Sequence, residues 1–299
     1  MDALVRFAPI LLLFLLGVAL RRAGIARTEH GDRLLAVVVW VGLPALVLAT
    51  ITRISLEPAL ALLPLAAIFT ILVTAPVVIG LGRALRLPRR TLGAFVIGPL
   101  IMNPAVEYPF VLMAWGDAGV AHLALFDLGN AVLVLTAVYG LAHWFGSEAG
   151  ERSRPLRRVA TFPPAWAFVI ALVLNLTGVG LPHAAAGVLL EIGRWVVFLV
   201  IVAMGIYFDV RLVGSGTLLL AAAVRIGVGG LLGALWILAF DLEGMTRNVV
   251  LLGTLAPAGF NTVVFAAREN LDRAFASSLA SLSVLLGLLY IPLLLVVLE

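Results

Sequence analysis

Long apolar stretches alternate with short polar loops along the whole chain. A helix needs about 20 residues to cross the hydrocarbon core of a bilayer, and on that measure the pattern predicts ten membrane-spanning helices. They fall at residues 4–21, 33–52, 58–82, 91–115, 118–144, 163–181, 185–208, 215–240, 246–268 and 271–298. The most polar connection, residues 146–161, lies between the fifth and the sixth. The pattern therefore predicts an all-α polytopic membrane protein with two five-helix repeats, residues 1–145 and 162–299, joined by a cytoplasmic linker.

The arginines indicate which way the predicted helices cross the membrane. Fifteen of the twenty basic residues lie in loops that follow odd-numbered helices, three lie on the opposite side and two lie within helices. Cytoplasmic loops carry the excess of basic residues. This places the odd-numbered loops in the cytoplasm and both termini outside it, in a multi-pass protein of the inner (plasma) membrane. Because each half has five helices, the halves enter the membrane in opposite directions and form an inverted repeat.

Composition argues against several other classes of protein. Hydrophobic residues make up 63% of the chain and charged residues 12%, whereas a soluble domain is about half apolar and a quarter charged. The chain has no cysteine, which excludes disulfides and thiolate metal sites, and no lysine, which excludes a P-loop. We therefore expect no metal, no cofactor, no enzymatic activity and no nucleic-acid partner, and we assign the basic charge to membrane topology.

The fourth predicted helix, residues 91–115, is unsuited to the lipid as a single continuous helix. It holds Pro99, Pro104 and Pro109, and an interior proline costs a helix about 3 kcal/mol. Glu107 adds roughly 2.5–3.5 kcal/mol at mid-membrane. Interrupted helices are tolerated where the loosened backbone faces protein or a polar cavity, and paired interruptions mark binding sites in secondary transporters. The segment therefore predicts a broken helix that has a partner elsewhere in the chain.

The ninth predicted helix, residues 246–268, supplies that partner. When the first half is shifted by 153 residues, Pro104 falls on Pro257, and polar residues gather at both positions. The alternative is that the two prolines coincide by chance, since proline is common in membrane helices. We favour two crossover helices, each interrupted near its proline.

Three residues form a candidate ion-coupling site. Glu107 and Asp127 are predicted at similar depth on neighbouring antiparallel helices, and Asn130 shares a helix face with Asp127 at i+3. Two carboxylates close together in a low dielectric cannot both ionise freely, so they should hold a proton or share a cation such as sodium. The alternative is structural, with Asp127 hydrogen-bonded to the backbone that the proline frees.

Residues beside the two breaks form a candidate substrate site. Its predicted members are Asn103, Pro104, Pro257, Asn261 and Thr262. Asparagine offers both a donor and an acceptor, and a broken helix presents free N–H groups that suit a carboxylate. Their alternative roles are helix capping for the asparagines and helix packing for the threonine.

Arg225 lies about ten residues into the eighth predicted helix and must be paired or face a cavity. We expect it to be the charge partner of Glu107 or Asp127, and the alternative is that it attracts an anionic substrate.

The order and spacing of several short motifs resemble the auxin efflux carrier family over nearly the whole length. The first half carries Gly42-Leu43-Pro44-Ala45, Asn103 followed by Pro109, and Trp115-Gly116 leading to Phe126-Asp127-Leu128-Gly129-Asn130. The second half carries Pro163-Pro164, Met204-Gly205, Ala256-Pro257 through Asn261, Arg268-Glu269-Asn270 and Ala276-Ser277-Ser278. The chain departs from the family in Pro104 to Tyr108, which has no glycine.

The resemblance implies two inverted five-helix repeats with crossover helices, as in bile-acid symporters and sodium/proton antiporters. It implies a scaffold of predicted helices one, two, six and seven that forms a homodimer, and an elevator-like transport domain of helices three to five and eight to ten. The predicted function is secondary transport of a small organic anion, auxin-like or a mono- or dicarboxylate, coupled to a proton, to sodium or to neither. The alternatives are a bile-acid-type sodium symporter, a cation/proton antiporter or, less favoured, a membrane receptor that does not transport.

Overall fold

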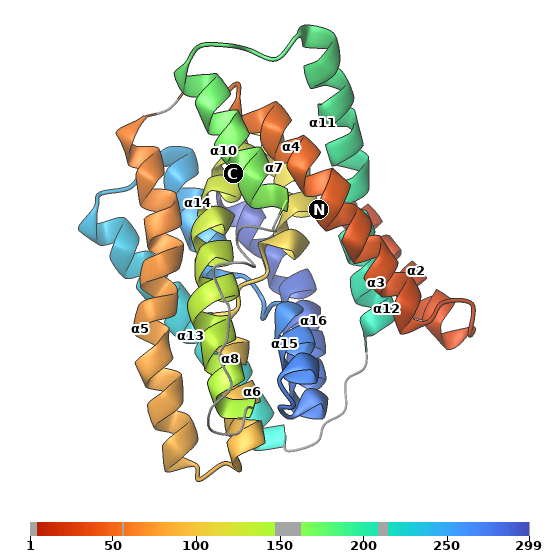
Figure 1. The fold of residues 1–299 in the computed structure, drawn as a ribbon, viewed down its shortest axis with the longest axis vertical. Helices are drawn as coiled ribbons and strands as arrows, with labels where there is room; N and C mark the ends of the chain where they lie inside the picture. Colours follow the sequence, from red (N-terminus) through yellow and green to blue (C-terminus); the bar gives the residue numbers. More distant parts are fainter. Residues whose placement is uncertain (1–4, 56, 147–162, 209–214, 299) are drawn as a thin grey trace.

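A computed structural model describes residues 5–55, 57–146, 163–208 and 215–298, and in these ranges helices joined by short connections make up most of the chain (Figure 1). Six stretches are long and apolar enough to cross a membrane: Thr28–Ile51, Pro58–Ala84, Pro104–Gly146, His183–Tyr207, Gly216–Ala239 and Arg273–Leu298. The protein is therefore an all-helical protein of membrane type, as predicted. Most of the predicted linker, residues 147–161, lies outside the described residues.

The helices begin and end close to the predicted segments. In the first half they are α2 (Ala8–Arg22), α3 (Thr28–Val37), the π-turn η1 (Val38–Gly42), α4 (Leu43–Ile51), the 3-10 turn η2 (Pro58–Ala61), α5 (Leu62–Ala84), α6 (Arg89–Leu100), α7 (Pro104–Leu133), the π-turn η3 (Val134–Val138) and α8 (Tyr139–Gly146). In the second half they are α10 (Pro163–Leu176), α11 (His183–Val197), α12 (Leu199–Tyr207), α13 (Ser215–Ala239), α14 (Gly244–Leu255), α15 (Asn261–Arg268) and α16 (Arg273–Leu298). Helices α2 and α10 have only 15 and 14 residues, so the count of ten spans stays a prediction.

The long helix α7 contains a reversal of the chain at Gly116. A straight helix would separate Met102 from Asn130 by about 40 Å, at about 1.5 Å per residue, yet Asn130 Nδ2 lies 3.4 Å from the carbonyl oxygen of Met102. Gly116 has φ 61° and ψ −152°, a conformation open to glycine because it lacks a Cβ. The two limbs of α7 on either side of Gly116 therefore run antiparallel, and the boundary predicted between residues 115 and 118 is where the chain turns.

The helices pack in two groups (Figure 1). In one group α12 packs against α2 and α3, and α4 packs against α10 and α11. In the other, α5 packs against α6 and α7, α13 against α14, and α15 against α16. These groups contain the segments that we predicted as scaffold and as transport domain, and the division into two moving units stays a prediction.

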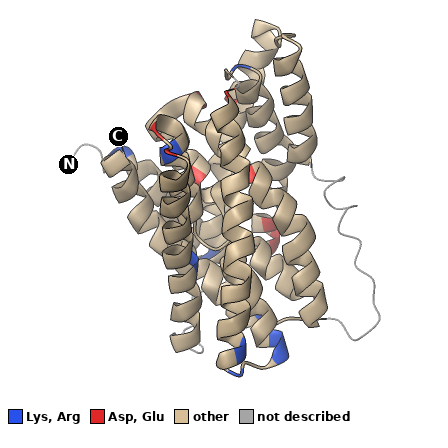
Figure 2. Ribbon diagram, turned by 90° about the vertical axis from the view of Figure 1, so that its left-hand side faces the viewer, with Lys and Arg blue, Asp and Glu red and all other residues tan. Residues whose placement is uncertain are grey.

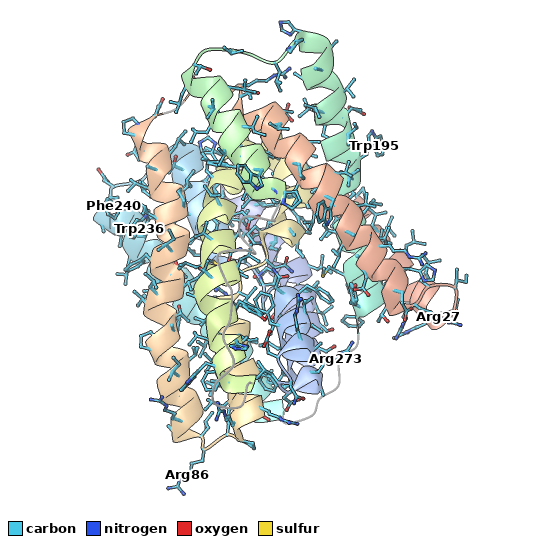
Figure 3. All side chains as sticks on the ribbon, in the orientation of Figure 1. Arg27, Arg86, Trp195, Trp236, Phe240 and Arg273 are labelled. Carbon is cyan, nitrogen blue, oxygen red and sulfur yellow. The ribbon has the colours of Figure 1, made fainter. Side chains whose placement is uncertain are left out.

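The outer surface of the bundle is apolar. Large apolar side chains on the outside of the bundle include Trp195, which is 71% exposed, and Phe240, and Figure 3 shows both projecting outward. An extended apolar exterior of this kind marks a surface that is covered in its natural setting. Several basic residues lie at the lower end of the bundle in Figure 2, which also shows others higher up. Arg86, labelled in Figure 3, lies at the lower end. The apolar exterior suits a protein that crosses a bilayer.

Candidate functional site at the crossing of two broken helices

Both predicted broken helices are interrupted, and the interruptions meet. Helix α6 ends at Leu100 and α7 begins at Pro104, while α14 ends at Leu255 and α15 begins at Asn261. Between them the extended backbones pair as an antiparallel bridge of Met102 with Ala258. The N–H of Gly259 donates to the carbonyl oxygen of Ile101 at 2.7 Å. Backbone groups that leave two helices in the middle of an apolar bundle thus satisfy each other.

The prolines contribute unequally to the breaks. Pro104 occupies the first turn of α7, where its missing N–H costs nothing, and Pro257 lies in the extended stretch between α14 and α15. Pro99 and Pro109 lie inside helices. Gly259 is required at the crossing because a Cβ there would collide with Ile101 and approach the Met102 carbonyl. The interruption therefore depends on one proline in each segment and on a glycine that allows the close approach.

Arg225 joins the ends of the two half-helices that enter the crossing. It lies on α13, is 1% exposed, and donates from Nη1 to the carbonyl oxygen of Pro99 at 2.9 Å and from Nη2 to that of Thr254. Both acceptors lie in the last turn of a helix, α6 and α14 respectively, where carbonyls lack intrahelical donors and the helix dipole is negative. A single guanidinium thus neutralises two converging helix ends.

A glycine and a tyrosine complete this arrangement. A Cβ on Gly229, one turn beyond Arg225 on α13, would strike both the Arg225 guanidinium and the Thr254 carbonyl. The glycine makes room for the buried arginine. Tyr290 of α16 donates its hydroxyl to the carbonyl of Leu255, the last residue of α14. Tyr290 was not among the predicted site residues, and a phenol in the apolar C-terminal half of α16 is the signal that could have identified it.

Glu107 is the most buried charged group in the described part of the chain. Its side chain is 0% exposed, and neither carboxylate oxygen has a hydrogen-bond partner there. It lies in the first turn of α7, where the helix dipole favours an anion, and it interacts electrostatically with Arg225 and Asp127. The structure therefore places Arg225 near Glu107, although the hydrogen bonds of the guanidinium go to backbone carbonyls. The predicted role of Arg225 as a charge partner stays a prediction.

Asp127 and Asn130 form a polar pair on the returning limb of α7. Asn130 Nδ2 donates to Asp127 Oδ1 at 2.9 Å, while Asn130 Oδ1 has no partner in the described residues. Asp127 also borders a small cavity of about 30 Å³, whose other polar side chain is Tyr108. A cavity of that size holds a water molecule or a small ion, since a site needs about 10–15 Å³ for one water.

The predicted substrate-site residues divide into a buried group and an exposed one. Asn103, Pro104, Pro257 and Thr262 are buried, and the Nδ2 of Asn103 and the hydroxyl of Thr262 have no hydrogen-bond partner within the described ranges. Asn261 is exposed at the start of α15. The crossing therefore brings Asn103 together with Glu107, Asn130 and Arg225, but leaves Asn261 outside the buried set. The substrate and coupling roles of these residues stay predictions.

No group of three or more His, Asp or Glu side chains in the described residues is placed to hold a metal ion. What the site offers is a set of buried polar atoms without partners, contributed by both limbs of α7, by α13 and by α15. Buried polar groups in native proteins are normally hydrogen-bonded. Such a concentration of free donors and acceptors at mid-bundle suits a site that binds a polar or charged small molecule.

Comparison with known proteins finds relatives over nearly the whole chain. The chain is 28% identical over 292 residues to a protein of Methanothermobacter thermautotrophicus named as an uncharacterized transporter, covering 95% of this chain and 94% of that protein. It is 23% identical over 296 residues to a protein of Methanocaldococcus jannaschii named in the same way, covering 95% of both. No family model matches the chain. These similarities, together with the apolar helical architecture, support a membrane transporter.

Proposed function

We propose that this protein is a secondary membrane transporter of a small organic anion, which it binds where the two broken helices cross. The crossing carries the proposal. Two interrupted helices meet deep in an apolar bundle. Around their crossing lie the guanidinium of Arg225 on α13 and the carboxylates and amides of α7 and its N-terminal cap. Interrupted backbone at membrane depth is tolerated where it is buried in protein or lines a cavity, and paired interruptions of this kind are binding sites in secondary transporters.

An anionic substrate suits the electrostatics of the crossing. Helices α7 and α15 both begin there, so their free N–H groups and positive dipole ends lie at the site. Asn103 and Thr262 add side-chain groups without partners in the described residues. A carboxylate would accept from these donors, while the fixed charge of Arg225 holds the opposite ends of the crossing helices together. We assign the substrate to small carboxylates, auxin-like or mono- or dicarboxylic.

We infer ten spans in two inverted five-helix repeats, with both termini outside the cytoplasm, as in the auxin efflux carrier family. The two packing groups support a scaffold of α2, α3, α4, α10, α11 and α12 and a transport unit of the remaining helices. In that arrangement the crossing belongs to one unit and moves as a body past the other. The transporter would act as a homodimer through its scaffold, and access would alternate by an elevator-like motion.

Glu107, Asp127 and Asn130 are the proposed coupling group. They gather carboxylate and amide oxygens beside the Met102 carbonyl, and such a group can hold a proton or a sodium ion. The oxygen-rich environment of Asn130 specifically favours a second candidate, a sodium symporter of the bile-acid type. Dependence of flux on sodium at constant pH, against dependence on pH without sodium, separates the two.

The proposal is tested by ligand-induced stabilisation followed by flux. The purified protein is heated in the presence of a panel of carboxylates, with and without sodium, at two pH values. A ligand that binds only the native state raises the midpoint of unfolding, so at least one carboxylate should do so, and the same carboxylate should enter proteoliposomes. Substitution of Asn103 by Ala should remove both effects. Stabilisation by organic cations or neutral solutes alone would contradict the proposal.

A further inference from the structure

A large cavity lies between the two helix groups, at the end of the bundle that carries α15 and the start of α16. It has a volume of about 1100 Å³, and its walls come from α3 and α12 on one side and from α15 and α16 on the other. Three arginines border it, Arg21, Arg268 and Arg273, and Figure 3 shows Arg273 at the lower end of α16. The cavity lies on the side that the arginine distribution assigns to the cytoplasm.

The wall formed by α15 and α16 is basic. Arg268 and Arg273 are exposed and make no hydrogen bond or ion pair with any described residue. The acids between them in the sequence are engaged elsewhere. Glu269 Oε2 lies 2.8 Å from His143 Nδ1 of α8, and Asp272 accepts from Thr91 at 2.9 Å. The two arginines thus face the cavity without local compensation.

The opposite wall carries the acids of the cavity. Glu29 and Asp32 of α3 border it, and Asp32 accepts a hydrogen bond from the hydroxyl of Tyr207 at the end of α12. Three arginines against two carboxylates leave one positive charge in excess. The separation of charges between the walls concentrates the positive potential on the α15–α16 side, and a cleft with low-dielectric walls focuses such a potential.

A line of hydroxyl groups leads inward from the basic wall. Arg273, Ser277 and Ser281 recur at intervals of four along α16, so they share one helix face. Ser277 borders both the large cavity and a smaller one deeper in the protein, and Ser281 borders the deeper one. The rings of Tyr207 and Phe260 border both cavities and stack with centroids 4.0 Å apart. Phe260 is the N-cap of α15, so the deeper cavity borders the second break.

We propose that this cavity is a cytoplasmic vestibule that binds small carboxylate anions before they pass the Tyr207–Phe260 pair and reach the crossing. Arg268 and Arg273 form its anion site, and Ser277 receives the anion as it moves inward. This proposal rests on the proposed function for the identity of the anion, while its electrostatic part stands on the vestibule alone. Bidentate pairing of arginine with a carboxylate supplies both attraction and orientation.

The electrostatic part is tested with single cysteines, because the natural chain has none. Ser277→Cys is labelled with a negatively charged (sulfonatoethyl) and a positively charged (trimethylammonioethyl) methanethiosulfonate, and each rate is divided by that of the same reagent with a free thiol. The anionic reagent should react faster, by about threefold or more, and added salt should reduce the difference. Arg268→Gln and Arg273→Gln in this background should each lower the ratio at least twofold. Arg22→Gln, on α2 outside the cavity, is the matched control and should leave it unchanged.

The passage at the Tyr207–Phe260 pair and the binding of a carboxylate in the vestibule are tested with further single-cysteine variants. Ser281→Cys should react several-fold more slowly than Ser277→Cys, and Phe260→Ala should remove most of that difference. Malonate should slow labelling of Ser277→Cys in vesicles of neutral lipid. Preference for the cationic reagent, indifference to both arginine substitutions, or protection only by vesicles of anionic lipid would overturn the proposal. If the charge preference holds while no carboxylate is transported, the proposed function fails and the anion vestibule stands.

Discussion

The two breaks meet, yet they are built differently. The break before α7 is closed, with Asn103, Glu107 and Asn130 all buried. The break before α15 opens toward the vestibule, with Phe260 only partly buried and Asn261 exposed. The first break holds the charges, and the second borders the route by which a ligand would arrive. Although both segments are interrupted near a proline, their environments differ in burial and in charge.

The helices that lead into the crossing, α6 and α14, have side-chain donors bound to the carbonyls of their last turns. The helices that leave it, α7 and α15, carry side-chain groups without partners in the described residues near their starts. Arg225 and Tyr290 occupy carbonyls in the last turns of α6 and α14. Atoms without partners in the described residues include those of Glu107 and Asn130 on α7 and of Thr262 on α15, together with Arg225 Nε on α13. The starts of α7 and α15 thus carry unpaired side-chain groups, whereas the last turns of α6 and α14 have their carbonyls paired.

The largest effect is expected from Arg225→Met. It leaves the carbonyls of Pro99 and Thr254 without their donor, and each buried polar group left unsatisfied costs about 1–3 kcal/mol. Unfolding in mixed micelles should show a loss of that size, and Arg22→Met, an exposed arginine on α2, should show little. Arg225→Lys should fall between them because lysine lacks the planar fork that reaches two acceptors. Unchanged stability of Arg225→Met would show that the guanidinium does not hold the crossing together.

A smaller effect is expected from Gly229→Ala on the same helix. The added methyl group would meet the Thr254 carbonyl and the Arg225 guanidinium, and overpacking of this kind costs about 1–3 kcal/mol. The matched control is Gly227→Ala, where the methyl group meets nothing within 4 Å, so stability should change by less than about 1 kcal/mol. Equal behaviour of the two variants in the same unfolding assay would contradict the described contact of α13 with α14.

Asp127→Asn tests whether the buried break before α7 couples transport to an ion. The substitution removes the charge of the acceptor of the Asn130 amide but keeps an oxygen that can accept the same hydrogen bond, so stability should change by no more than about 1 kcal/mol. Its main effect should be on transport, which should lose its dependence on pH or on sodium while substrate binding persists. Flux in proteoliposomes across a pH series, with and without sodium, measures this. A variant whose flux responds like the natural protein would remove Asp127 from coupling.

The smallest effect is expected where Glu269, just after α15, contacts His143 of α8. Burial raises the pKa of the Glu269 carboxyl, so the folded protein holds this proton more tightly than the unfolded chain. The resulting stabilisation is complete below the unfolded pKa of about 4.3 and is lost as the pH rises through the folded pKa. Glu269→Gln should flatten that decline in thermal unfolding midpoints across the window. Glu57→Gln, at an exposed position, should leave the decline of the unfolding midpoint unchanged. If the decline persists in Glu269→Gln, a group other than Glu269 causes it.

Much of the fold follows from local patterns in the sequence. Stretches of about 20 apolar residues predict the helices, and the positions of Pro104 and Pro257 predict where two of them are interrupted. Proline acts on its own backbone and on the preceding turn, so its effect can be located without knowledge of the tertiary structure. The same reasoning overstates Pro99 and Pro109, which lie inside α6 and α7. Neighbouring helices stabilise a proline in a membrane helix, and sequence alone does not show which prolines have such neighbours.

Candidate site residues could be chosen from the sequence, and their roles stay predictions, but their contacts could not be predicted. The intramembrane charge of Arg225 predicts a buried partner, but the partners are carbonyls of Pro99 and Thr254. Which carbonyls are free depends on where each half-helix ends. The vestibule could not be predicted, because its walls come from α3 and α12 on one side and from α15 and α16 on the other, which are far apart in the sequence. Ser277, which packing alone would have explained, borders it.

The most direct test of the account is the distance between the two breaks. Residues paired in an antiparallel bridge have Cα atoms about 4.5–5.5 Å apart, within the range of a disulfide. Met102→Cys with Ala258→Cys, in a chain without other cysteines, should therefore cross-link within one molecule under mild oxidation. Met102→Cys with Gly187→Cys on α11 is the control and should not. A protein that folds with Met102→Cys and Ala258→Cys but forms no cross-link would show that the broken helices do not meet, and the proposed site would not exist.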